Sequence, residues 1–277
     1  MRDDELVWLD GALRPAAEAT VSIFDHGLTV GDGVFETLKA TAGTPFAPRR
    51  HLDRLRRSAA GLGLQIPYDD DVLREAMAGV LASADRASAR VRITVTGGAA
   101  PLGSDRGEAP ATVVVAAGDL VMPAGTAAVC VVPWPRNERG AMAGIKTTSY
   151  AENVVALAFA KERDCAEAIF ATTTGMLCEA TGSNVFCVFG DQIITPPLSS
   201  GCLAGVTRDL VLEVTDAVEE DIAMRVFAAA DRVFLTSTGR DVQAVHRIDG
   251  ATLRAPGRVT QDAAAAFAAL AATTSDP

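Results

Sequence analysis

The sequence is short of positive charge and of long apolar runs. Its 277 residues carry 25 Lys and Arg against 35 Asp and Glu, a net charge of −10 at pH 7. Binding to nucleic acid requires a basic surface that meets phosphates, so this balance argues against a nucleic-acid partner. No apolar run approaches the roughly 18–20 residues that cross a bilayer, and the acidic stretch 1–5 lacks the apolar core of a signal peptide. We therefore expect a cytoplasmic protein with no membrane partner.

Cysteine and histidine are too scattered for a metal or disulfide framework. The five cysteines form no C-x-x-C pair, and the three histidines include no H-E-x-x-H pattern. Zinc ribbons, disulfide scaffolds and zinc hydrolases are accordingly disfavoured. We expect free, buried thiols and no metal site.

Lysine is the scarcest charged residue, with only Lys39, Lys146 and Lys161 in the chain. Chemistry that needs a side-chain amine therefore has three candidates. Lys161 lies on a charged helical face and Lys39 ends an exposed strand pattern, so both look solvated. Lys146 lies between an extended segment and a helix, where loops present side chains to clefts. Simple solvation is the ordinary alternative for Lys146 as well.

Strand and helix patterns mix along the chain and predict an α/β (α+β) fold in two domains. Ser149 and Glu152 fit the S-x-x-E capping box and predict that a helix begins there. The expected helices cover 48–63, 72–81, 149–163, the stretch from about 205, and 261–272, and the clearest strands cover 6–9, 34–39, 91–95, 112–117, 129–132, 185–189 and 232–236. The predicted organisation is an N-terminal α+β domain over 1–117, a connector over 118–125 and a C-terminal domain over 126–277.

Three further features could bind an anionic, nitrogen-containing ligand. The segment 203–208 offers a Gly and a Thr at a helix N-terminus, where N–H groups and the helix dipole favour a phosphate. Glu179 precedes a tight turn between strands, and Arg54 lies on a helix rich in arginine. Each has an ordinary alternative, namely a plain N-cap, a turn carboxylate and a solvated arginine. The Gly31-Asp32-Gly33 turn lacks the third glycine of a dinucleotide loop, so we reject a Rossmann interpretation.

Together, these features make one chemical set. Pyridoxal phosphate requires an amine to join its aldehyde, donors for its phosphate and an anion beside its ring nitrogen. Lys146, the 203–208 segment with Arg54, and Glu179 supply these three parts in turn.

On these residues the chain resembles the class IV aminotransferase family of pyridoxal-phosphate enzymes, known as fold type IV. That family includes branched-chain aminotransferases, D-amino-acid aminotransferases and aminodeoxychorismate lyases. The matching segments, in the family's order, are 24–27 with 31–36, 51–55, 146–150, 179–184, 205–208 and 236–242.

The resemblance implies a role for each matching residue. Lys146 matches the Schiff-base lysine, and Tyr150 the tyrosine beside the ring oxygen. Glu179 matches the carboxylate at the pyridine nitrogen. The phosphate contacts fall to Arg54, Val206, Thr207 and Thr238. The implied fold has a smaller N-terminal α+β domain and a larger, barrel-like C-terminal domain with the cofactor between them, and such enzymes are normally homodimers acting on small molecules.

The activity within the family is a finer question. Phe35-Glu36-Thr37 puts threonine at a position where many aminodeoxychorismate lyases also have it, and 146–150 resembles lyase-like members. The sequence therefore favours an aminodeoxychorismate lyase of the folate pathway, with Thr37 as a catalytic candidate beside Lys146 and Tyr150. The alternative is an aminotransferase for branched-chain or D-amino acids or amines with a 2-oxo acid acceptor. Arg92 and Arg106 are candidates for binding a substrate carboxylate.

Overall fold

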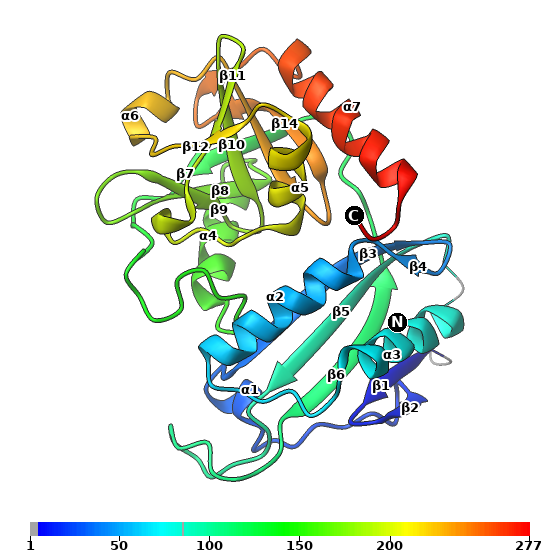
Figure 1. The fold of residues 1–277 in the computed structure, drawn as a ribbon. Coiled ribbons are helices and arrows are strands. Elements are labelled where there is room, and N and C mark those ends of the chain that lie inside the picture. Colours follow the sequence, from blue (N-terminus) through cyan, green and yellow to red (C-terminus); the bar gives the residue numbers. More distant parts are fainter. Residues whose placement is uncertain (1–4, 85) are drawn as a thin grey trace. The chain divides into compact units, whose positions relative to one another are not determined.

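The computed structural model describes residues 5–84 and 86–277, and their contacts group them into two units (Figure 1). Residues 1–4, on which the expected cytoplasmic location partly rests, lie outside this described part. The contacts place 145–150, which the sequence assigned to the C-terminal domain, in unit 1. Unit 1 comprises the residues up to Val121, Ile145–Tyr150 and Asp276, and unit 2 comprises Met122–Gly144, Ala151–Ser275 and Pro277.

Unit 1 is an antiparallel sheet with its two longer helices on one face (Figure 1). Among the described residues the sheet has six strands in the order β2-β1-β6-β5-β3-β4. The strands are β1 (Leu6–Leu9), β2 (Ala12–Pro15), β3 (Gly33–Thr41), β4 (Thr44–Pro45), β5 (Ser88–Thr96) and β6 (Thr112–Asp119), and the helices are α1 (His26–Thr29), α2 (Pro48–Gly61) and α3 (Asp70–Ala84).

The core of unit 1 lies between the sheet and helices α2 and α3. Leu55 of α2 and Val80 of α3 pack with Leu38 of β3, and all three are fully buried. Side chains alternate along a strand, so the residues of β3 on either side of a core-facing residue such as Leu38 point to the other face of the sheet. Phe35 and Thr37 of β3 belong to that second face.

Unit 2 is built around a larger mixed sheet. In its described residues, the strand order is β12-β11-β10-β13-β14-β7-β8-β9, with β15 paired to β14. Strand β7 is parallel to both of its neighbours, β14 and β8. The strands are β7 (Ala127–Val131), β8 (Glu167–Ala171), β9 (Leu177–Ala180), β10 (Asn184–Phe189), β11 (Gln192–Thr195), β12 (Val218–Glu219), β13 (Arg232–Ser237), β14 (Asp241–Ile248) and β15 (Ala251–Thr252), and the helices are α4 (Ala151–Lys161), η1 (Leu198–Ser200), α5 (Val206–Val214), α6 (Met224–Phe227) and α7 (Arg258–Thr273).

Most expected elements are confirmed, but the capping box before α4 is wrong. The helix begins at Ala151, and the Ser149 hydroxyl donates to the carbonyl of Gly31 at 2.8 Å. Glu152 accepts a hydrogen bond from Arg136 at 3.2 Å. Both side chains are thus taken by partners far away in sequence, which a local motif does not reveal. Within the described part of the chain, no helix combines the length and apolarity needed to cross a membrane.

Candidate active site

The backbone of Lys146 is held against the edge of β3. Its carbonyl accepts from the Phe35 N–H at 3.0 Å, and Thr148 N–H donates to the Gly33 carbonyl at 2.7 Å. On its other side, the Lys146 N–H donates to the hydroxyl of Ser58 on α2 at 3.3 Å. The segment therefore pairs with β3 as a short extra strand. Lys146 lies in a loop, as predicted, but hydrogen bonds hold the backbone of this loop in place.

The Gly-Asp-Gly turn forms the seat of this segment. The carbonyl of Gly31, a residue at φ +69°, accepts from the hydroxyls of Thr148 at 3.0 Å and Ser149 at 2.8 Å. A Cβ at Gly33 would come within 2.7 Å of the Val95 carbonyl oxygen. Glycine is thus favoured at Gly31 by its left-handed backbone and required at Gly33 by the close approach of a neighbouring strand.

Lys146 reaches an aromatic and cationic cluster within unit 1. Its Nζ is 4.5 Å from the Phe35 ring centroid and 6.0 Å from that of Tyr150. The two rings meet edge to face at 5.2 Å, and the Arg92 guanidinium lies 3.7 Å from the Phe35 centroid. Thr37 follows Phe35 on the same strand face and pairs in register with Arg92. The structure thus brings together the three catalytic candidates and Arg92.

A buried ionic network lies on the opposite, helix-covered face of β3. Glu36 is 0% exposed, and its carboxylate accepts from Arg54 Nε at 2.7 Å and Arg54 Nη2 at 2.8 Å. His51 Nδ1 is 2.7 Å from the same carboxylate. Burial opposes ionisation of Glu36, but the charge and hydrogen bonds of Arg54, aided by His51, outweigh it and hold the pKa of Glu36 well below its usual range. Burial lowers the pKa of His51 against the opposing effect of Glu36, so the imidazole is neutral at pH 7.

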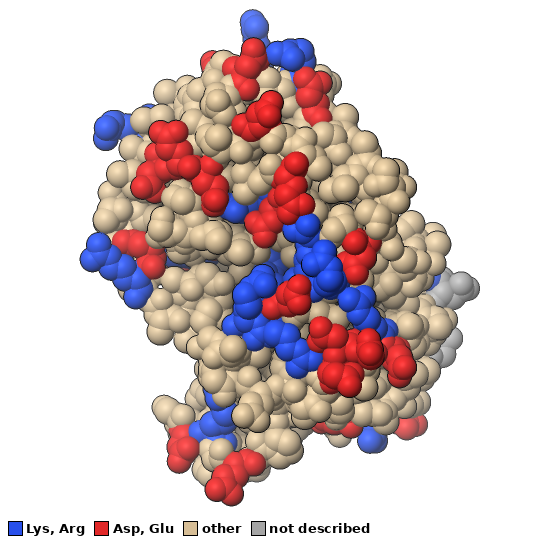
Figure 2. All heavy atoms as spheres, viewed as in Figure 1, with Lys and Arg blue, Asp and Glu red and all other residues tan. Residues whose placement is uncertain are grey.

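Burial distinguishes Arg54 from its neighbours. Lys and Arg side chains gather over α2 on the surface (Figure 2). Arg49 and Arg57 of this helix are exposed, whereas Arg54 is only 5% exposed. The solvated-arginine alternative therefore holds for Arg49 and Arg57 and fails for Arg54. The sequence did not single out Glu36 and His51 for a role, although both lie within segments that match the family.

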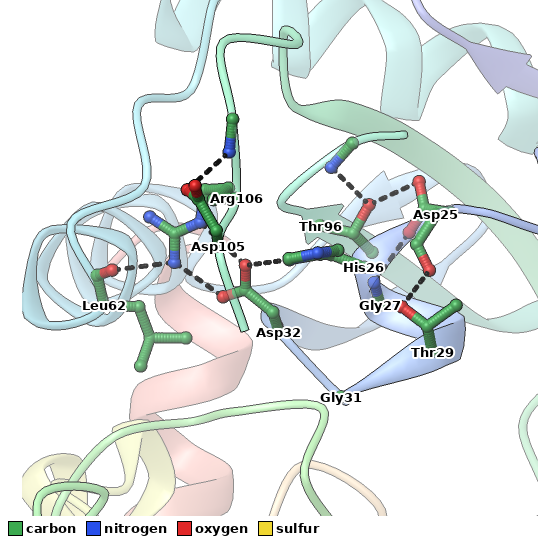
Figure 3. A network of polar contacts seen from close by, with 12 residues as sticks. Asp25, His26, Gly27, Thr29, Gly31, Asp32, Leu62, Thr96, Asp105 and Arg106 are labelled. Atoms are coloured by element: carbon green, nitrogen blue, oxygen red, sulfur yellow. Dashed lines mark hydrogen bonds and ion pairs between the residues drawn. The ribbon is translucent and has the colours of Figure 1, made fainter. Parts of the chain in front are cut away.

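The two arginines considered for substrate binding have different surroundings. Arg106 donates to the Asp32 carboxylate at 2.7 and 2.6 Å and to the Leu62 carbonyl at 3.0 Å (Figure 3). Its hydrogen bonds lower the pKa of Asp32, although partial burial opposes this shift, and His26 contacts the same carboxylate. Arg106 therefore ties the loop after β5 to the Gly-Asp-Gly turn. This leaves Arg92, which contacts the same Phe35 ring as Lys146, as the better carboxylate-binding candidate.

In unit 2, Glu179 is held by a partner that the sequence did not indicate. One carboxylate oxygen accepts from Arg136 Nη1 at 2.5 Å and the other from the Leu203 N–H at 3.0 Å. Arg136 also donates to Asn153 at 2.8 Å and stacks 4.0 Å from the Phe170 ring centroid. Glu179 itself is 8% exposed. A hydrogen bond to each oxygen thus fixes the orientation of the Glu179 carboxylate. A carboxylate held in this way is suited to pair with a protonated nitrogen of a ligand.

A second carboxylate supports the turn that follows Glu179. Glu167, buried on β8, accepts from the Thr181 hydroxyl at 2.8 Å, the Gly182 N–H at 2.7 Å and the Ser183 hydroxyl at 2.5 Å. Arg240 Nε donates to it at 2.7 Å. The turn is thereby tied to the β13–β14 connection.

The N-terminus of α5 has the features of an anion site. Gly205 is its N-cap residue and supplies no side-chain hydrogen bond to the first turn. A Cβ at Gly205 would lie 2.0 Å from the Asn184 amide oxygen, while the Asn184 nitrogen donates to the Leu203 carbonyl at 2.8 Å. Glycine is therefore required, and the N–H groups of Val206 and Thr207 face the helix entrance.

The candidate site residues thus fall into two groups, one in each unit. Each group combines predicted residues with supports that only the structure revealed. Lys146, Tyr150, Thr37 and Arg54 lie in unit 1, and Glu179, Val206, Thr207 and Thr238, the last in the turn after β13, lie in unit 2.

These groups define an enzyme that handles amines with a phosphorylated aromatic cofactor: an amine beside aromatic rings, an oriented carboxylate and a helix N-terminus suited to phosphate. The chain belongs to the amino-transferase class IV family, whose model matches residues 33–248. The family predicted from the motifs is therefore confirmed. With it the cofactor, pyridoxal phosphate, is confirmed as well, and one solved branched-chain aminotransferase of similar structure contains pyridoxamine 5'-phosphate.

Individual relatives are aminotransferases. The chain is 30% identical over 253 residues to a putative branched-chain-amino-acid aminotransferase of Methanocaldococcus jannaschii, covering 88% of each chain. It is 29% identical to a D-alanine aminotransferase of Bacillus licheniformis, covering 92% of this chain and 93% of the other. The branched-chain aminotransferase of Thermoproteus uzoniensis, solved with norvaline, superimposes with a TM-score of 0.90 at 29% identity, covering 95% of this chain and 93% of that chain. The predicted fold type IV is thus confirmed, whereas these names do not support the closer likeness to aminodeoxychorismate lyases.

Proposed function

We propose that this enzyme transfers the amino group of a branched-chain or D-amino acid to a 2-oxo acid. The observation that carries the proposal is the cluster of Lys146, Phe35, Tyr150 and Arg92, in which an amine and a guanidinium contact the same aromatic ring. Such a cluster offers a base and a carboxylate partner close together. The aminotransferase relatives support this activity over the lyase that Thr37 suggested.

The residues present fit pyridoxal phosphate. When bound, this cofactor supplies an electron-withdrawing ring that stabilises negative charge on a substrate carbon. Gly205, where a Cβ would clash with Asn184, places no side chain at the α5 N-terminus, and Glu179 is held by Arg136 and the Leu203 N–H. We assign the amine to Lys146, the ring nitrogen to Glu179, the ring oxygen to Tyr150 and the phosphate to Arg54, Val206, Thr207 and Thr238.

The protein's part in the reaction is proton movement and orientation. Lys146 Nζ takes the proton from the carbon that bears the amino group and later returns a proton, as a general base and then acid. The fixed backbone of Lys146 keeps Nζ in place for both transfers. Arg92 binds a substrate carboxylate, and Arg136 holds the Glu179 carboxylate towards its partner.

A product assay tests the proposal. The protein reconstituted with pyridoxal phosphate is given L-leucine or D-alanine, each with 2-oxoglutarate, and in parallel aminodeoxychorismate with no acceptor. We expect glutamate and the 2-oxo acid of one donor, formed only when the acceptor is present. Release of 4-aminobenzoate and pyruvate over many turnovers without an acceptor, and no amino transfer, would establish the lyase instead.

An exposed apolar surface around α1 supports a homodimer. Ile23 is 71% exposed, Leu28 70% and Leu102 75%. The Ala100 N–H donates to the Phe24 carbonyl, which brings the loop that carries Leu102 beside α1. Apolar surface of this kind marks protein contacts, and we propose that a second copy of the chain covers it. The L28D variant should then shift the molar mass measured by light scattering from dimer towards monomer.

A further inference from the structure

The guanidinium of Arg54 is gripped along one edge. Its Nε and Nη2 atoms donate to the two oxygens of Glu36 at 2.7 and 2.8 Å. A guanidinium is a planar fork with five N–H groups, and a carboxylate on the Nε edge fixes the direction of the end formed by Nη1 and Nη2. Whatever anion Arg54 recognises with that end therefore meets it in one orientation.

The gripping carboxylate is itself held by a histidine. His51 Nδ1 lies 2.7 Å from Glu36 Oε2, and because a carboxylate only accepts, Nδ1 carries the hydrogen. His51 and Arg54 lie one turn apart on α2, whereas Glu36 lies on β3. All three are at most 5% exposed. The network thus ties the helix to the strand through three hydrogen bonds from two residues to one carboxylate.

A network of this kind affects binding through preorganisation. A mobile arginine loses side-chain freedom when it binds an anion, and a guanidinium already held by a partner loses less. Removing the His51 donor leaves Glu36 with one oxygen less restrained, so that the Arg54 fork can rotate. The charges of Glu36 and Arg54 are unchanged by that removal.

We propose that His51, acting through Glu36, is a positioning residue that orients Arg54 towards the cofactor phosphate. The inference rests on the proposed function, because it takes Arg54 as a phosphate ligand. It goes further because it assigns a role to His51 and Glu36, which take no part in the chemistry. It also predicts that His51 affects the affinity for the phosphate group and not the affinity for the pyridine ring.

The test compares ligands with and without a phosphate. The Kd values of pyridoxal phosphate and of pyridoxal are measured by titrating the cofactor-free full-length protein. H51L removes the donor, whereas H51N restores an N–H close to the place of Nδ1. R57A, at an exposed arginine of the same helix, is the matched control. R54M gives the Kd of pyridoxal phosphate expected when the arginine that binds the phosphate is removed.

We expect H51L to weaken pyridoxal phosphate about tenfold, which is about 1.4 kcal/mol, with pyridoxal unchanged. H51N should come within about threefold of wild type, and R57A should equal it. The inference is overturned if H51L binds pyridoxal phosphate as the wild type does, if both ligands weaken equally, or if H51N behaves like H51L. Wild-type protein that fails to bind pyridoxal phosphate would refute the proposed function itself. R54M that binds pyridoxal phosphate normally would refute the phosphate role of Arg54, and this inference with it, and would leave the proposed amino transfer untouched.

Discussion

Replacing Glu36 by glutamine tests how much the buried network contributes to stability. The E36Q substitution keeps the shape of the side chain and removes its charge. The carboxylate is 0% exposed and holds Arg54 through two hydrogen bonds, and Arg54 is itself only 5% exposed. The variant therefore leaves a guanidinium charge buried with a neutral partner.

The expected loss is large. Removing one member of a buried ion pair costs about 3–5 kcal/mol, because the remaining charge stays desolvated and uncompensated. Against a typical unfolding free energy of about 5–15 kcal/mol, this is a substantial fraction of the total. The double variant E36Q/R54M removes both charges and should recover at least about half of the loss.

The loss should also depend on pH in a defined direction. The pKa of Glu36 is lowered in the folded protein, so its contribution is fully present above the unfolded value of about 4.3 and is lost as the pH falls towards the folded value. The stability gap between wild type and E36Q should therefore be constant from about pH 8 to 5 and narrow below about pH 4.

Urea unfolding followed by circular dichroism, at several pH values, measures this gap. Equal m-values in the two proteins would show that the comparison reflects native-state stability. A gap below about 1 kcal/mol at pH 7, or one that widens on acidification, would refute the inferred charge balance of the network.

Three further predictions concern the reactive groups. Borohydride reduction of the protein loaded with pyridoxal phosphate should place the pyridoxyl group on Lys146 alone, and K146A should abolish turnover; a label on another lysine would contradict the assignment. The native protein should resist thiol reagents at pH 8, because all five cysteines are buried and burial raises the pKa of Cys130 to about 12 and of Cys202 to about 11; rapid labelling before unfolding would contradict this. The T37V variant keeps the shape of the side chain and removes its hydroxyl. We expect it to lower kcat without loss of the cofactor, because the hydroxyl helps to position the proton that Lys146 moves. An unchanged kcat would contradict a catalytic role for Thr37.

The sequence by itself determined the elements and the family. Helix α2 and strand β5 were predicted from apolar spacing, since each buries one face and exposes the other. The candidate cofactor residues came from short segments whose order along the chain matches the family. The sequence was sufficient for these predictions because each pattern or motif spans only a few neighbouring residues.

Long-range partners could not be predicted this way. Ser149 looks like a helix cap, but its hydroxyl bonds to Gly31, 118 positions away. No local motif marks Arg136, yet it donates a hydrogen bond to Glu179 across 43 positions. A side chain's partner depends on which strands become neighbours, and the sequence pattern does not specify that pairing.

The tertiary structure also decided which of several similar residues differ in their surroundings. Arg54 and Arg57 lie one turn apart on α2, yet only Arg54 is buried, because it faces Glu36 on β3. The sequence offers Arg92 and Arg106 equally as candidates for binding a substrate carboxylate. In the structure Arg106 forms an ion pair with Asp32, which leaves Arg92. Burial and pairing set the energy of a charge, and both arise only when distant segments pack against each other.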